Sequence, residues 1–168
     1  MENTIKLNIQ QLIIDRLRQT KRKNIEVVID YMVKNGYFTR HCHSHHRYYG
    51  GHADHAWQTY QIALKHNKTY NKRNPLDEDS IAICSLLHDF YICRGMDEIH
   101  GHGGRSAAML KKLGFKLPIE EFNAIRFHMG RKNKPYYELF EKAKNQPLRL
   151  LVHKADGKSA SRKEGHSI

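Results

Sequence analysis

Apolar residues recur at intervals of three and four along most of the chain, and strict alternation of apolar and polar residues is scarce. In the first stripe Ile9, Leu12, Ile13 and Leu17 share one face, which predicts a helix over residues 5–18. The same spacing predicts further helices over residues 24–34, 52–66, 77–89, 102–113, 118–128, 136–144 and 147–161. We therefore predict an all-α domain of seven or eight helices without a convincing strand.

The composition is typical of a globular domain. The chain has 168 residues, of which 39% are apolar and 27% charged, so it can bury a core without disulfides or a structural metal. Its three cysteines lack CxxC spacing, which favours a reducing, cytoplasmic environment. The N-terminus lacks a basic region followed by an apolar stretch, and no apolar run approaches the length of a membrane span. We expect a cytoplasmic protein without a membrane partner.

The charge balance is strongly basic, with a formal net charge of +12 at pH 7. Such a balance favours anionic partners, which include nucleic acids, nucleotides and other phosphorylated substrates. The basic residues are spread over several segments, so a solvated basic surface without a specific partner explains the charge equally well. The charge thus narrows the partner class without identifying a ligand.

The pair His88-Asp89 closes the apolar run of residues 81–87, which is typical of a buried helix. Buried imidazole and carboxylate groups are costly unless something pairs with them, and a transition metal would satisfy several at once. His102, His128 and Asp156 lie at helical spacing from apolar residues of later predicted helices. In a helical bundle such groups can converge on one site. Any single histidine is more often a hydrogen-bonded or surface residue than a metal ligand, and the chain has 13 histidines. A metal site is therefore indicated only by these residues taken together.

In this order the residues resemble a known family. His55, His88-Asp89 and Asp156 are similar to the H…HD…D signature of the HD-domain metal-dependent phosphohydrolases. The sequence around these residues, 46–55, 86–89 and 151–156, also resembles the sequence that surrounds each motif in the family. The resemblance implies a compact HD-like bundle with a central metal site. It implies an HD-like core over residues 45–156 of a single domain, 1–168. N-terminal helices within residues 1–36 precede this core, and a basic tail of residues 157–168 follows it.

His102 and His128 look like the additional ligands of two-metal members of the family. By that resemblance His55, His88, Asp89 and Asp156 hold one divalent ion, and Asp89, the expected catalytic residue, bridges to a second. Mixed imidazole and carboxylate ligands suit Fe, Mn, Co, Ni or Zn, and the sequence does not choose among them. His52 is an alternative to His55, because the two lie three residues apart on one predicted helix face.

Phe90-Tyr91-Ile92 follows the HD pair, where the family often has a small residue and a lysine. No lysine stands there to hold a substrate phosphate, and Arg94, Arg105, Arg131 or Lys132 could substitute for it. The resemblance also implies that His45, His46 and Tyr49 flank the pocket and could touch a substrate. The histidine-rich run of residues 41–46 lacks the spaced pairs of a structural zinc site, which favours an opportunistic metal-binding loop.

The resemblance therefore implies metal-activated hydrolysis of a phosphomonoester or phosphodiester, with a nucleotide or oligonucleotide as substrate. Two alternatives stay open. Some relatives with the same six ligands are di-iron oxygenases, and a non-catalytic module that binds nucleic acid or nucleotide would also suit the missing lysine and the basic charge.

Overall fold

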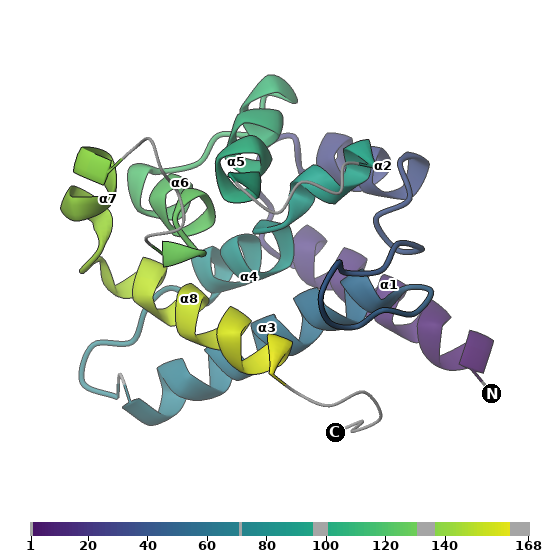
Figure 1. The fold of residues 1–168 in the computed structure, drawn as a ribbon, viewed down its shortest axis with the longest axis horizontal. Helices are drawn as coiled ribbons and strands as arrows, with labels where there is room; N and C mark the ends of the chain where they lie inside the picture. Colours follow the sequence, from purple (N-terminus) through teal and green to yellow (C-terminus); the bar gives the residue numbers. More distant parts are fainter. Residues whose placement is uncertain (1, 71, 96–100, 131–136, 162–168) are drawn as a thin grey trace.

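The computed structural model describes residues 2–70, 72–95, 101–130 and 137–161. In this part of the chain the elements are all helical, and no strand occurs (Figure 1). They are α1 (Glu2–Gln19), α2 (Ile25–Lys34), α3 (Gly51–Tyr70), α4 (Glu78–Leu87), the short 3-10 helix η1 (Phe90–Arg94), α5 (His102–Lys112), α6 (Ile119–Arg126), α7 (Tyr137–Ala143) and α8 (Pro147–Ala160). The all-α prediction is confirmed.

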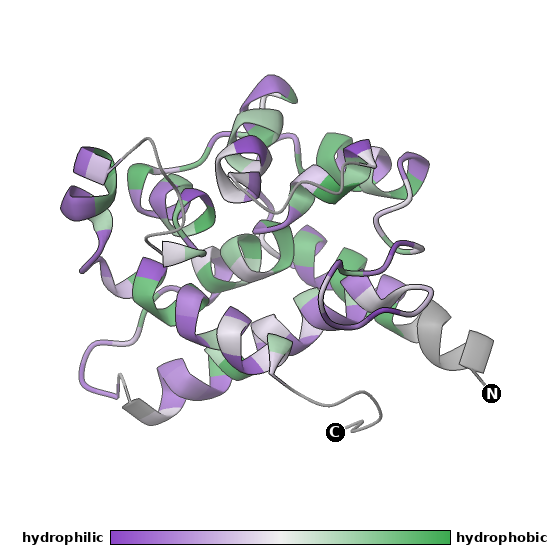
Figure 2. Cartoon of the chain, viewed as in Figure 1, coloured by the Kyte–Doolittle hydropathy of each residue, from purple (hydrophilic) through white to green (hydrophobic). Residues whose placement is uncertain are grey.

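Helix α4 lies at the centre of the molecule, where α1, α3, α6 and α8 pack around it (Figure 1). Its residues 81–87 are all buried, because they are apolar or small on every side. Figure 2 shows the same concentration of hydrophobic residues along α4. The helix begins at Asp77, whose side chain accepts a hydrogen bond of 2.7 Å from the backbone N–H of Ser80. His88 and Asp89, which follow α4 directly, therefore lie in the interior of the protein.

The N-terminal helices are tied to this core by polar contacts as well as by apolar packing. Arg22, between α1 and α2, forms a bidentate pair with Glu121 of α6, with N–O distances of 2.8 and 2.9 Å. The Glu121 side chain is buried, so this pair is well shielded from water. The side chain of Asn24 donates to the carbonyl of Gly114 after α5 at 2.8 Å. These contacts tie the start of α2 to α6 and to the turn after α5.

Helix α8 continues to Ala160, four residues into the segment expected as a basic tail, and its Ser159 is fully buried. Residues 162–168 of that segment lie outside the described residues. Within the described residues, no helix combines the length and the apolar character needed to cross a membrane.

Candidate metal centre

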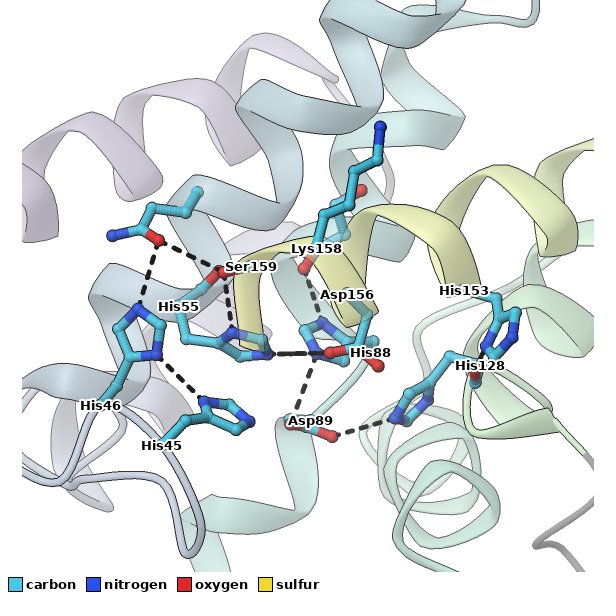
Figure 3. A network of polar contacts seen from close by, with 12 residues as sticks. His45, His46, His55, His88, Asp89, His128, His153, Asp156, Lys158 and Ser159 are labelled. Carbon is cyan, nitrogen blue, oxygen red and sulfur yellow. Dashed lines mark hydrogen bonds and ion pairs between the residues drawn. The ribbon is translucent and has the colours of Figure 1, made fainter. Parts of the chain in front are cut away.

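The structure brings the six predicted ligand residues together from separate helices. His55 lies in α3, His88 at the end of α4, Asp89 before η1, His102 at the start of α5, His128 just after α6, and Asp156 in α8. Figure 3 shows His55, His88, Asp89, His128 and Asp156 directed toward one another. His55, His88, His102 and His128 are all buried, so the cluster lies within the bundle rather than on its surface.

One half of the cluster joins α3, α4 and α8. The Nε2 atom of His55 lies 3.1 Å from Oδ1 of Asp156 and 3.2 Å from Nε2 of His88. The Nε2 atom of His88 lies 3.7 Å from Oδ1 of Asp156 and 3.4 Å from Oδ2 of Asp89. Three side chains from three helices thus present ligand atoms to one small volume, with Asp89 at its edge.

The other half joins α5 and the end of α6. Oδ1 of Asp89 lies 3.1 Å from Nε2 of His102 and 3.3 Å from Nε2 of His128, and these two nitrogens are 2.9 Å apart. Asp89 therefore turns one carboxylate oxygen to each half. This is the position expected for a residue that bridges two cations.

The ring nitrogens that face away from the cluster are held by their own partners. Nδ1 of His88 donates to the carbonyl of Ser85, and Nδ1 of His128 to the carbonyl of Ile125, both at 2.8 Å. These carbonyls belong to the last turns of α4 and α6, where the helix leaves such groups without an intrahelical partner. Nδ1 of His55 lies 3.0 Å from Oγ of Ser159. The three contacts leave Nε2 of each ring to serve as the ligand atom.

The spacing of the ligand atoms fits divalent transition metals. Two ligand atoms that bind one ion at about 2.1 Å lie about 3.0–3.4 Å apart at octahedral or tetrahedral angles. The separations in both halves run from 2.9 to 3.7 Å. Oδ1 of Asp89 is also buried without a hydrogen bond, although two imidazole nitrogens lie within 3.3 Å of it. A cation between these atoms would satisfy all of them.

The electrostatics of the centre also favour a cation. Burial would lower the pKa of His88, but the carboxylates of Asp89 and Asp156 raise it to about 9. Burial would likewise raise the pKa of Asp89, yet the imidazoles of His88 and His102 hold it well below its ordinary value. The pKa of Asp156 is also lowered, against the effect of burial, by its hydrogen bond to His55 and by His88. Both carboxylates are therefore ionised at neutral pH.

A cavity of about 390 Å³ opens onto this centre. Its lining includes Asp89, Asp156, residues 41–45 of the loop before α3, Tyr91 and Ile92 of η1, and His102, Met129 and His153. The loop can close against α3 because residue 51 is glycine: a Cβ there would lie 2.1 Å from the carbonyl oxygen of His46. The histidine-rich run thus forms a wall of the cavity.

The residues predicted to bind substrate are placed differently from one another. His45 lines the cavity, whereas His46 is buried beside it and Tyr49 is 63% exposed. Arg94 is exposed and Arg105 half-buried, and neither belongs to the cavity lining among the described residues. Arg131 and Lys132 lie outside the described residues. His52 lines the cavity with its ring 4.5 Å from that of Tyr37, while His55 faces His88 and Asp156.

Sequence reasoning missed four residues that shape the site. Ser159 holds His55, Gln58 accepts from His46, Tyr91 stacks on His102 at 5.0 Å between ring centroids, and His153 bonds the carbonyl of His128. Two of these four residues could have been found from their spacing in the sequence. Gln58 and Ser159 each follow a predicted ligand by three residues, which places them beside that ligand on its helix.

Comparison with protein families identifies the chain. The model of the HD domain matches residues 53–160, which is more than half of the chain, and the protein therefore belongs to the HD-domain family. This family consists largely of metal-dependent phosphohydrolases. Searches of curated proteins and of solved structures gave no significant match.

Proposed function

We propose that the protein is a metal-dependent phosphohydrolase that acts on a phosphomonoester or phosphodiester, with a nucleotide or oligonucleotide as its substrate class. The observation that carries this proposal is the geometry of Asp89, whose Oδ2 lies 3.4 Å from Nε2 of His88 and whose Oδ1 lies within 3.3 Å of Nε2 of both His102 and His128. A ligand common to two cations fits the two-metal arrangement that stabilises the attacking and the leaving oxygen in hydrolysis of a phosphoester.

The protein's residues have distinct parts in this proposal. His55, His88 and Asp156 would hold one divalent ion, His102 and His128 the other, and Asp89 both. Mixed imidazole and carboxylate ligands suit Fe, Mn, Co, Ni or Zn. Such ions lower the pKa of a bound water toward neutrality and neutralise phosphoryl oxygens as charge builds up on them. Burial of the centre strengthens these electrostatic effects because little water competes there.

The surroundings of the centre support an anionic substrate of modest size. The net charge of +12 draws anions toward the protein, and exposed Lys65, Lys154 and Lys158 gather around His66 on α3 and α8, outside the cavity lining. The cavity of about 390 Å³ lies near the lower end of the range for small-molecule sites, which is about 300–1,000 Å³. It suits one nucleotide, either free or at the end of a longer strand.

Metal analysis combined with a substrate panel tests this function. We expect protein purified without added metal to contain a divalent transition metal and to release phosphate or a nucleotide from at least one phosphoester. Asp89→Asn protein should do neither. Dioxygen consumption by the iron-loaded protein without phosphoester hydrolysis would replace this proposal with the oxygenase. Salt-sensitive nucleic acid binding that survives Asp89→Ala, without turnover, would replace it with the binding module.

A further inference from the structure

The cavity wall contains a short chain of hydrogen bonds that ends at His45. Nδ1 of His45 lies 3.0 Å from Nδ1 of His46, and Nε2 of His46 lies 3.2 Å from Oε1 of Gln58. Figure 3 shows His45, His46, His55 and Ser159 in one group beside the metal centre. His45 belongs to the cavity lining, whereas His46 is 5% exposed and lies behind it.

The direction of each hydrogen bond follows from the chemistry of Gln58. An amide oxygen only accepts, so Nε2 of His46 carries the proton between them. A second proton on this buried ring would be costly, which leaves Nδ1 of His46 as an acceptor. Nδ1 of His45 must then donate to it, and a neutral His45 keeps its lone pair on Nε2.

A third cation is the competing explanation, because one ligand atom from each of His45, His46 and His55 lies within 4.8 Å of the others. Both nitrogens of His55 are already engaged, however. Its Nε2 faces Asp156 at 3.1 Å, and its Nδ1 contacts Oγ of Ser159 at 3.0 Å. His45 and His46 alone are too few ligands for a cation site, so the contact between them is better explained as a hydrogen bond.

Gln58 also reaches the metal centre. Oγ of Ser159, which holds Nδ1 of His55, lies 3.3 Å from the carbonyl oxygen of His55 and 3.4 Å from the same Oε1 of Gln58. The amide oxygen of Gln58 is therefore in reach of His46, which contacts His45, and of Ser159, which contacts His55. Gln58 on α3 thus contacts both the cavity wall and the serine that holds a metal-ligand candidate.

We propose that Gln58 is a positioning residue that holds His45 with an unprotonated Nε2 facing the cavity, and that His45 thereby selects substrates with a hydroxyl group near the phosphoester. This inference rests on the proposed phosphohydrolase function. An imidazole lone pair accepts a hydrogen bond from a hydroxyl, whereas it repels an ionised phosphate oxygen. A sugar hydroxyl of a nucleotide is the matching group, so ribonucleotides are favoured over deoxynucleotides.

The protonation pattern of His45 can be measured without turnover. Nitrogen-15 chemical shifts of the zinc-loaded protein should show a protonated Nδ1 and an unprotonated Nε2. Gln58→Leu should produce a mixture of the two tautomers. Gln61→Leu is the matched control, since Gln61 is half-buried one turn further along α3 and forms no hydrogen bond with the site residues among those described. A protonated Nε2 in the wild type, or an unchanged pattern in Gln58→Leu, would overturn the proposal.

Kinetics then test the substrate preference. We expect wild-type kcat/KM to fall about tenfold, mainly through KM, when the 2′-hydroxyl of a nucleotide is removed. His45→Phe and Gln58→Leu should lose this discrimination, and Gln61→Leu should keep it. Equal discrimination in wild type and His45→Phe would refute the role of His45. If the wild type hydrolyses no phosphoester at all, the proposed function fails, and the chemical shifts alone decide the positioning role.

Discussion

The ends of α4 and α6 anchor a histidine in the same way, but the pKa values of the two histidines shift in opposite directions. Each helix is followed by a buried histidine, His88 or His128, whose Nδ1 donates to the carbonyl three residues earlier at 2.8 Å. His88 faces the carboxylates of both Asp89 and Asp156, and these raise its pKa to about 9 despite burial. His128 has a close contact with one carboxylate among the described residues, that of Asp89, and burial keeps its pKa below the ordinary value.

The comparison shows that a shared backbone anchor sets the orientation of a ligand but not its charge. The number of carboxylates in reach sets the charge. Without a bound cation, the positive charge of the centre would therefore concentrate on His88, beside the two acidic groups. The half formed with His55 and Asp156 is the more acidic one, and we expect it to hold its cation more tightly.

Removal of the carboxylate between the two ends should have the largest effect. Asp89→Asn keeps the shape of the side chain but removes the charge that both halves use. We expect loss of bound metal and a fall in kcat/KM on the order of 10³-fold or more. Asp30→Asn, on the exposed face of α2, is the control and should retain both properties. Wild-type turnover by Asp89→Asn would contradict the site.

Removal of His128 should separate the two halves. We expect His128→Ala to retain about one of two ions, because the ligands around His88 are intact. Elemental analysis after gel filtration gives the occupancy. Adding Ser159→Ala in this background should weaken the remaining ion about 10–100-fold, since Ser159 orients His55. Loss of both ions from His128→Ala alone would show that the halves do not bind independently.

Two adjacent glycines of α5 allow a matched test at the end of α6. A Cβ at Gly103 would lie 2.6 Å from the carbonyl oxygen of Ile125 and 2.7 Å from that of Arg126, whereas one at Gly104 would meet nothing within 4 Å. Gly103→Ala should lower the free energy of unfolding by about 1–3 kcal/mol. Gly104→Ala should raise it by about 0.4–1 kcal/mol. Urea denaturation measures both, and equal effects would contradict this packing.

The pH dependence of stability should distinguish the two histidines in metal-free protein. The raised pKa of His88 contributes stability below about pH 6.5, and this is lost as the pH rises toward 9. The lowered pKa of His128 contributes stability above about pH 6.5, which is lost as the pH falls. Each slope is at most about 1.4 kcal/mol per pH unit.

Urea denaturation with a chelator, from pH 5 to 9, measures these slopes. His88→Gln should flatten the alkaline side and His128→Gln the acidic side. The reverse pattern would show that the charge is not concentrated on His88.

Much of the fold followed from the sequence because helical periodicity and helix-end signals are local. The HD family and the all-α fold are confirmed, whereas α4 ends at Leu87, two residues before Asp89, to which the predicted helix extended. The metal-ligand roles stay predictions that metal analysis tests. Local patterns could not place Tyr49 or Arg94, because the course of a loop depends on close approaches such as that between Gly51 and His46.

The family match begins at residue 53, after the loop whose His41, His43 and His45 form one side of the cavity. The six candidate ligands all lie inside the matched region. His45, to which we assign substrate selection, therefore lies outside the stretch that carries the candidate ligands, although residues of that stretch line the cavity as well. Grafting a different segment in place of residues 41–46 is a practical route to redirecting such a protein toward a new substrate while its reactive centre stays as it is.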